Sequence, residues 1–290
     1  MGIVLALEQT LNGIQLGVML FLMAAGLTLV FGIMNLVNLA HGSFYMVGAF
    51  VASTFVVMTG DFIAGVVIAV VITGLVAVAI ELGLLRFIYT RTHLDHVMIT
   101  IGLIFIFDEM TRIIWGVVPV SLPIPKYLSG FVELLPGVRY PTYRLTVLIV
   151  GIMVALALYL AISHTRVGMW VRAGASDRPM ALALGVNVPK VFSIVFAVGG
   201  ALAGLAGIMA GPIVAVQVGM GEPVLVLALV VMVIGGVGSF RGAFIAALMV
   251  GIVDTFGRVL LPPAIGSMVI FIFMAAVLAW RPTGLFSAHA

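Results

Sequence analysis

The chain has 290 residues, of which 64% are hydrophobic and 8% are charged, and its mean hydropathy is +1.36. A soluble domain carries about 25% charged residues, so this chain cannot cover itself with polar surface, and we predict an all-α polytopic membrane protein. The absence of cysteine excludes disulfides, thiolate metal sites and cysteine nucleophiles, and the net charge of +3 gives no indication of nucleic-acid binding.

The apolar runs predict eight or nine transmembrane helices within a single transmembrane domain, residues 1–290. A helical span needs about 20 apolar residues, because about 30 Å of hydrocarbon is crossed at about 1.5 Å per residue. The N-terminus carries Glu8 and no basic residue, so the first run is predicted to be a retained span rather than a signal peptide. The expected spans are 12–33, 43–60, 62–86, 97–118, 144–163, 191–211, 222–237 (which would be re-entrant if there are eight), 243–260 and 265–281.

The basic residues of the loops predict an orientation with the N-terminus outside and the C-terminus inside. By the positive-inside rule, the side richer in Lys and Arg faces the cytoplasm. In this orientation the first four spans and the last four have opposite topology, as an inverted repeat requires. The inner set comprises Arg86, Arg91, Arg166, Arg172, Arg178, Lys190, Arg241 and Arg281, and the outer set comprises Lys126, Arg139, Arg144 and Arg258.

Two loops are long enough to contact partners. The outer loop, 119–143, holds several prolines that favour extended or turn structure, and it is either a connector or a docking surface for an external partner. The inner loop, 164–190, contains ASDRPMALALG, which predicts a short helix capped by Asp177 and ended by Gly185. So short a helix is not stable alone, and it is expected to pack on lipid or in a groove of a cytoplasmic partner.

Ionisable residues inside the expected spans are candidate functional groups. Asp108 and Arg112 are spaced i,i+4, with Glu109 also in reach of Arg112, and Asp254 and Arg258 repeat that spacing. They are expected to form self-neutralised pairs near the interface or, alternatively, a proton or ion relay. Glu81 has no partner at that spacing, and Arg86 or a neighbouring span is its plausible mate. GxxxG pairs, which suit close helix packing in the subunit or between subunits, occur at Gly13/Gly17, Gly200/Gly204 and Gly207/Gly211.

Polar residues mark two breaks in the apolar pattern. In GIMNLVNLAHGSFYMVG, 32–48, the amides of Asn35 and Asn38 end one helix and Ser43 can cap the next. In GPIVAVQVGMGEP, 211–223, Gln217 carries the one uncharged side-chain amide. The two breaks occupy equivalent places in the predicted repeat. We therefore hypothesise that Asn35, Asn38, Ser43 and Gln217 line a translocation path, whereas His41, which lacks metal-ligand companions, is expected to be structural.

Three blocks carry a resemblance to a known family. They are GLTLVFGIMNLVNLAHGSFYMVGAF at 26–50, GMWVRAGASDRPMALALGVNV at 168–188 and GGVGSFRGAFIAAL at 235–248. In order and spacing they resemble branched-chain amino acid ABC transporter permeases of the LivH type, over essentially the full length.

The resemblance implies a heterodimer with a second, homologous permease subunit, two cytoplasmic ABC ATPase subunits, a periplasmic substrate-binding protein and residence in the bacterial inner membrane. It also implies that the short inner helix couples to the ATPases. Ala181, Ala183 and Gly185 match the family's coupling segment, in which Asp177 and Arg178 also lie, although its Glu is absent here.

Three functions remain open on the residues alone. The first is a permease subunit of an ABC importer for branched-chain or related hydrophobic amino acids, which the resemblance favours. The second is an ion-coupled secondary transporter, and the third is a passive permease for urea or short amides. Neither of the two lysines, Lys126 and Lys190, lies in a P-loop, so the chain is predicted to be a non-enzymatic subunit without a cofactor, and its substrate is left open.

Overall fold

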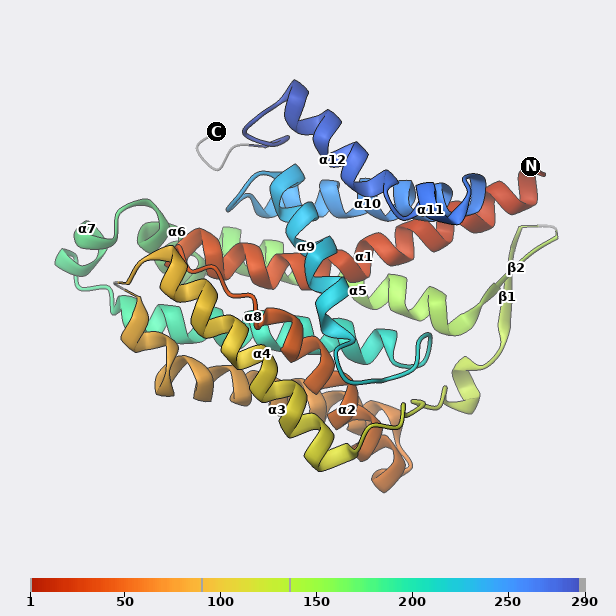
Figure 1. Ribbon diagram of the computed structural model, residues 1–290, viewed down its shortest axis with the longest axis horizontal. Helices are drawn as coiled ribbons and strands as arrows, with labels where there is room; N and C mark the ends of the chain where they lie inside the picture. Colours follow the sequence, from red (N-terminus) through yellow and green to blue (C-terminus); the bar gives the residue numbers. More distant parts are fainter. Residues whose placement is uncertain (1, 90, 136, 287–290) are drawn as a thin grey trace.

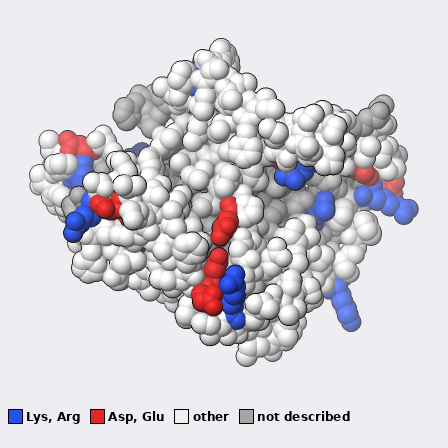
Figure 2. Space-filling model, viewed as in Figure 1, with Lys and Arg blue, Asp and Glu red and all other residues white. Residues whose placement is uncertain are grey.

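The computed structural model describes residues 2–89, 91–135 and 137–286. Its helices run mostly along one long axis, with the N-terminus and a β-hairpin at one end and helices α6 and α7 at the other (Figure 1). We call these ends the hairpin end and the α7 end. Most of the face in Figure 2 is free of charged side chains. They gather near the two ends and in one short column between them, and further basic groups lie between that column and the hairpin end. This distribution suits a chain whose middle faces lipid.

Helix α1, Ile3–Met34, runs through the centre of the bundle. It begins nine residues before the expected span at 12, because Ile3–Leu11 contains no Gly or Pro to interrupt it. It ends at Asn35, which adopts a left-handed conformation with φ of 50° and donates its backbone N–H to the Phe31 carbonyl. Asparagine tolerates this conformation better than other non-glycine residues, so Asn35 acts as a C-cap.

The remaining elements follow the predicted spans in order, with additions in the loops. The inner loop forms two short helices and the outer loop forms a hairpin. The elements are α2 (His41–Thr59), α3 (Phe62–Gly83), η1 (Leu85–Ile88), α4 (His93–Trp115), η2 (Lys126–Leu128), β1 (Phe131–Leu135), β2 (Val138–Pro141), α5 (Thr142–His164), α6 (Arg166–Ser176), α7 (Arg178–Ala183), α8 (Val188–Ala210), α9 (Gly221–Gly235), α10 (Phe240–Leu260), α11 (Pro263–Gly266) and α12 (Val269–Trp280).

Six helices in the described part of the chain are long and apolar enough to cross a membrane: α1, α2, α3, α5, α8 and α10. Helices α9 and α12 are apolar but shorter, with 15 and 12 residues. At about 1.5 Å per residue, α9 covers about 22 Å, less than the hydrocarbon thickness. Helix α4 has 23 residues but carries Asp108, Glu109 and Arg112 near its end.

The outer loop departs from an all-α fold, because β1 and β2 pair as a two-stranded antiparallel sheet. Five prolines in 119–141 predicted extended or turn structure, in a connector or a docking surface. Phe131 and Val132, however, favour a strand, and Gly137 supplies the turn at φ +85°. The same loop reaches the second break in the bundle. Val120 and Val216 exchange two backbone hydrogen bonds of 2.8 and 2.9 Å, which tie the outer loop to the segment between α8 and α9.

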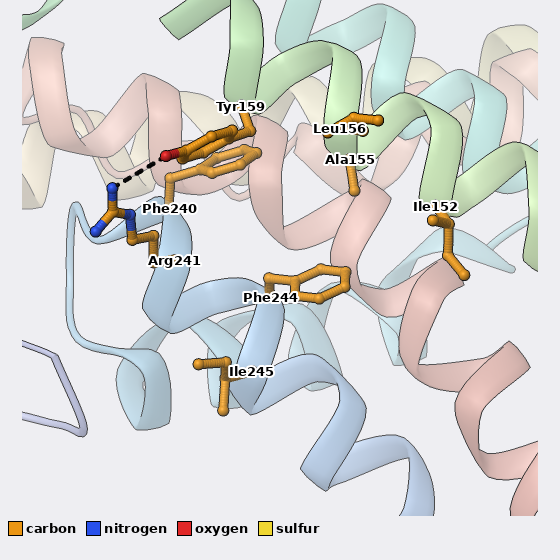
Figure 3. Close-up of a pocket in the computed structure, with 8 residues that line it drawn as sticks. All are labelled: Ile152, Ala155, Leu156, Tyr159, Phe240, Arg241, Phe244 and Ile245. Atoms are coloured by element: carbon orange, nitrogen blue, oxygen red, sulfur yellow. Dashed lines mark hydrogen bonds between the residues drawn. The ribbon is translucent and has the colours of Figure 1, made fainter. Parts of the chain in front are cut away.

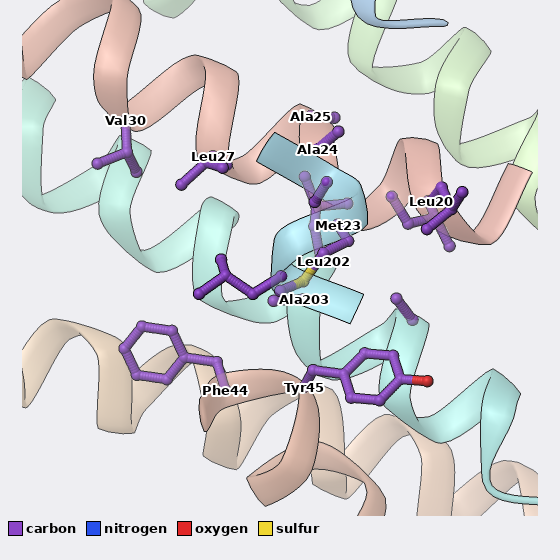
Figure 4. Packing of buried hydrophobic residues seen from close by; sticks show 14 of the residues in the cluster. Leu20, Met23, Ala24, Ala25, Leu27, Val30, Phe44, Tyr45, Leu202 and Ala203 are labelled. Atoms are coloured by element: carbon purple, nitrogen blue, oxygen red, sulfur yellow. The ribbon is translucent and has the colours of Figure 1, made fainter. Parts of the chain in front are cut away.

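Close helix contacts at glycines hold the core together. Gly26 of α1 and Gly199 of α8 face each other, as do Gly42 of α2 and Gly221 of α9, so that a Cβ on any of them would meet the opposite backbone. Large side chains from α1, α2 and α8, including Met23, fill the space around these crossings (Figure 4). Such close backbone approach is the usual basis of helix association in lipid.

The predicted GxxxG glycines pack within the subunit. Gly13 and Gly17 face the backbone of α10, and Gly200 and Gly204 face α3. Helix α1 therefore packs on α10 as α8 packs on α3, while α1 and α8 cross each other at the centre.

Candidate functional site

A cavity of about 580 Å³ opens at the hairpin end, where the first turns of α1 and α5 meet the last turns of α10. The link between α8 and α9 forms its remaining wall. Three of its lining residues are charged, namely Arg144, Asp254 and Arg258, and the others are amides, Tyr45, Thr255 and apolar side chains. We call it the hairpin-end cavity.

Asp254 and Arg258 form the predicted i,i+4 pair on α10. The Arg258 Nε donates to the Asp254 Oδ1 at 2.7 Å. The Asp254 side chain is 4% exposed and that of Arg258 is 58% exposed, so the carboxylate is buried while its partner reaches outward. A buried carboxylate requires such a partner, because an isolated charge is costly away from water.

Arg144 is held by amide and phenol groups on the opposite wall. Its Nη1 donates to the Asn12 Oδ1 at 2.7 Å, and the same oxygen accepts from the Tyr140 hydroxyl at 3.3 Å. Tyr140 also reaches the Gln15 Oε1 at 3.5 Å. Helix α1 thus fixes the position of a guanidinium that begins α5. Among the described residues, no carboxylate pairs with Arg144.

A second cavity, of about 1080 Å³, lies at the α7 end. Asn35 lies in its wall, beside Arg172, Arg178 and Arg241, and no described acidic residue lines it. Arg172 donates to the Ile162 carbonyl at the end of α5. Arg241 donates to the Tyr159 hydroxyl at 3.2 Å. This α7-end cavity is therefore positively charged.

An apolar groove of about 440 Å³ lies between α5 and α10, adjoining the α7-end cavity (Figure 3). Figure 3 shows Ile152, Leu156 and Phe244 along the groove, with the Arg241–Tyr159 hydrogen bond at its end. Arg144 and Arg258 lie farther along the same two helices, so polar cavities flank an apolar stretch on one face of the bundle.

The first break places Asn38 and His41 in the interior. Each side chain is 1% exposed. Both amide atoms of Asn38 and the His41 Nε2 have no hydrogen-bond partner among the described residues. The His41 ring packs edge-on against Phe44 with centroids 6.1 Å apart. Unpaired buried polar groups are rare in proteins, so these side chains are unusual for a purely structural bend.

Ser43 lies elsewhere, in a narrow slot beside Asp108 of α4 and Glu222 of α9. The slot has a volume of about 10 Å³, which is the minimum for one water molecule. Asp108 does not pair with Arg112 as predicted from spacing alone. Arg112 instead contacts the Glu109 Oε2 at 3.2 Å, and that pair is exposed.

Gln217 lines the hairpin-end cavity and is exposed. The four polar residues predicted for the path thus do not gather at one point. Asn35 and Gln217 lie in the two end cavities, Asn38 is buried outside both, and Ser43 lines the slot.

The inner loop forms the helix that its sequence indicates. Asp177 caps α7 by accepting the Met180 N–H at 2.9 Å, and Gly185 ends the turn at φ +84°. Helix α6, which precedes it, was not expected, although Thr165 caps it by accepting from the Gly168 N–H at 3.1 Å. Ala181 faces inward at 2% exposed, whereas Ala183 and the large side chains of Met180, Leu182 and Leu184 face outward.

Glu81 ties the end of α3 to α8 and to the segment that follows α3. Its side chain is fully buried and contacts Arg86 at 3.5 Å, the mate that the sequence suggested. It also accepts hydrogen bonds from the Tyr89 hydroxyl and, at 2.6 Å, from the Ser193 hydroxyl on α8. Burial, together with the bond to Glu81, raises the pKa of Tyr89 above its ordinary value.

This cluster reaches α7 through one aromatic ring. Phe192 packs edge-on against Tyr89, with ring centroids 5.4 Å apart. The Arg178 guanidinium at the start of α7 lies 4.8 Å above the same ring. Glu81 therefore links α3, α8 and α7.

Several site residues escaped sequence reasoning. Asn12, Tyr140 and Tyr159 form hydrogen bonds with residues far away in the sequence, and no local sequence pattern predicts that they lie at a cavity. A signal was available for Arg144 and Arg241, because each is a lone arginine in the first turn of an apolar helix. Such residues mark the ends of spans, where charged groups can face an aqueous opening.

The long apolar helices, the breaks before α2 and α9, and the polar openings on one face are typical of a helical membrane permease. The sequence pattern of the family described as "Branched-chain amino acid transport system / permease component" matches residues 9–278. The chain therefore belongs to this family, which is a family of transport permeases and not of enzymes, and it is a multi-pass protein of the inner (plasma) membrane.

Individual relatives agree with the family. The chain is 30% identical to the high-affinity branched-chain amino acid transport system permease protein LivH of Escherichia coli, over 96% of this chain and 94% of that one. It is also 30% identical to the corresponding BraD protein of Pseudomonas aeruginosa, over 96% and 95%. Among solved structures, PsaBC from Streptococcus pneumoniae in complex with Fab shares the fold with a TM-score of 0.51, at 12% identity over 92% of this chain and 90% of that chain.

Proposed function

We propose that the chain is the membrane-spanning permease subunit of an ABC importer that moves branched-chain or related hydrophobic amino acids, delivered by a periplasmic binding protein. The observation that carries this proposal is the family match over residues 9–278. Its complex would contain a second, homologous permease and two cytoplasmic ABC ATPases.

In this proposal the hairpin end is outside and the α7 end is inside. The α7-end cavity, with Arg172, Arg178 and Arg241, then faces the cytoplasm, as the positive-inside rule requires. Helices α4, α9 and α12 complete the crossings, and α9 leads from the break at the hairpin end back to the α7 end. The facing glycine pairs Gly26/Gly199 and Gly42/Gly221 support an inverted repeat that relates α1–α2 to α8–α9.

The substrate path follows the face formed by α1, α5 and α10. Gln217 lies at its outer mouth and Asn35 at its inner mouth, with the apolar groove between the two cavities. Asn38 and Ser43 join the path when the break between α1 and α2 moves. The unpaired amide of Asn38 supports this role, because such a group is costly in a purely structural bend.

Helix α7 is the coupling element. Asp177 and Arg178 fix its start, Gly185 fixes its end and Ala181 lies against the subunit, with Ala183 on the outer side. Met180, Leu182 and Leu184 are 56%, 50% and 76% exposed, so the six-residue helix and its C-cap residue, Leu184, present three large apolar side chains at the cytoplasmic end. Burial of this surface in a groove of an ATPase would stabilise the contact.

Affinity purification of the tagged chain from its native membrane tests the assembly. Recovery of a second permease and two ATPase copies is the expected result, identified by mass spectrometry of the intact complex. A chain that purifies without an ATPase, yet moves solute into liposomes under a proton or sodium gradient, would instead be an ion-coupled carrier. Gradient-independent flux of urea without nucleotide would indicate a passive permease.

A further inference from the structure

We propose that the hairpin-end cavity is a transit site for a zwitterionic α-amino acid, in which Arg144 binds the carboxylate and Asp254 binds the ammonium group. The inference rests on the proposed function and assigns substrate contacts to residues of this chain.

The charges in the cavity suit a ligand that carries both signs. Asp254 and Arg258 neutralise each other, whereas Arg144 pairs with no described carboxylate. The lining as a whole therefore has one positive charge left over, which attracts a carboxylate. An ammonium group alone would meet a cavity with a net charge of its own sign.

Arg144 is held in place with donors to spare. A guanidinium has five N–H donors, and the described contacts use one of them, to Asn12 at 2.7 Å. Asn12 is itself held by Tyr140 at 3.3 Å and by Gln9 at 3.4 Å, so the guanidinium is anchored before a ligand arrives. Arginine binds carboxylates through two parallel hydrogen bonds, a geometry that its free edge can supply.

Asp254 offers the complementary acceptor. Its Oδ1 accepts from Arg258 at 2.7 Å, and its Oδ2 receives no hydrogen bond from any described residue. An ammonium group carries three donors and can bind that oxygen while Arg258 keeps the other. Because the carboxylate is only 4% exposed, little water competes with this contact.

The rest of the cavity suits an aliphatic side chain. Leu16, Met19, Ile213 and Val224 contribute apolar surface between the charged groups, and the volume of about 580 Å³ exceeds what one amino acid fills. A spacious, open site binds weakly, which lets the substrate move on. We therefore expect recognition of the amino acid backbone with little selection among aliphatic side chains.

The chain lacks cysteine, so a single introduced thiol can report occupancy. Ala215 is exposed in the cavity wall, and Ala215→Cys in the assembled importer is labelled with an impermeant methanethiosulfonate reagent. Labelling of this chain is measured with and without L-leucine at millimolar concentrations. Saturating leucine should slow it by about fivefold or more, whereas 4-methylpentanoate and 3-methylbutylamine, which each lack one charge, should leave it within about twofold.

Asp254→Asn and, separately, Arg144→Gln should abolish the protection by leucine, while Glu109→Gln, in the exposed Glu109–Arg112 pair, should keep it. Ser176→Cys in the α7-end cavity is a second control, and leucine should not slow the labelling of its thiol. If Asp254→Asn fails to assemble, Arg144→Gln alone decides. Equal protection by the singly charged analogues, or none by leucine, would overturn the inference. If leucine does not protect the Ala215→Cys thiol but ATP-driven leucine uptake persists, only this inference is rejected. If the chain neither co-purifies with the other subunits nor takes up leucine, the proposed function is rejected.

Discussion

Replacing Glu81 should destabilise the subunit more than any other change to a single carboxylate. In Glu81→Ala, the Tyr89 and Ser193 hydroxyls lose their acceptor and Arg86 loses its ion partner. Hydrogen bonds to a charged group contribute about 1.5–3 kcal/mol each. The Arg86 contact adds less, because that side chain is 41% exposed and screened. We expect a loss of about 3–5 kcal/mol, the range for breaking a buried charge network.

The free energy of unfolding can be measured by titrating the purified protein with sodium dodecyl sulfate in mixed micelles. The fluorescence of the three tryptophans reports the transition. Tyr89→Phe removes one hydrogen bond to Glu81, and Ser193→Ala removes another together with the bond that Ser193 accepts from Arg86. Each change should cost about 1.5–3 kcal/mol. Glu109→Gln alters an exposed pair, so it serves as the matched control and should change stability by less than about 1 kcal/mol.

A Glu81→Ala variant as stable as Glu109→Gln would refute this reasoning. A second readout tests the link to α7, since Arg178 stacks on Phe192 next to Ser193. In the assembled importer, Glu81→Ala should lower the ATPase stimulation that the loaded binding protein produces. Unchanged ATPase stimulation would show that the Glu81 cluster has no part in coupling to the ATPases.

Three further changes have defined outcomes. Asp177→Ala removes the cap on α7 at a cost of about 1 kcal/mol and should reduce co-purification of the ATPases, with Asp177→Asn, which can still cap the helix, as the control. Gly221→Ala drives a Cβ into the Gly42 carbonyl and should abolish monodisperse elution from a size-exclusion column, whereas Gly102→Ala, where no atom is within 4 Å of the new Cβ, should elute normally. Asn38→Leu and Gln217→Leu should each lower leucine uptake at least severalfold without loss of assembly, and Asn38→Leu should raise the unfolding free energy by about 1–3 kcal/mol by removing an unpaired buried amide. Normal uptake kinetics in both variants would remove these residues from the path.

The order and type of the helices could be predicted from the sequence, because hydropathy in lipid depends on local composition. The helix at 178–183, with its cap at Asp177 and its stop at Gly185, followed from local rules as well. Helix boundaries were harder to predict where no Gly or Pro interrupts the helix, as at the start of α1. The hairpin was missed because prolines on either side masked a short strand pattern at 131–135.

The arrangement of the site could not be predicted, because it depends on contacts between distant helices. Asp254 and Arg258 are one turn apart, so their pairing was readable from spacing, whereas Asn12 and Arg144 meet across 132 positions. Spacing also suggested that Asp108 pairs with Arg112, but Arg112 forms its ion pair with Glu109. Sequence identified Asn38 as a polar group in an apolar setting but did not reveal that its amide is buried without a partner.

The most direct test of the account is leucine uptake into proteoliposomes that contain this chain with its second permease and ATPases. The account predicts uptake only when ATP and a leucine-loaded binding protein are both supplied, on opposite sides of the membrane. Uptake by this chain alone, driven by an ion gradient or by no energy source, would contradict it.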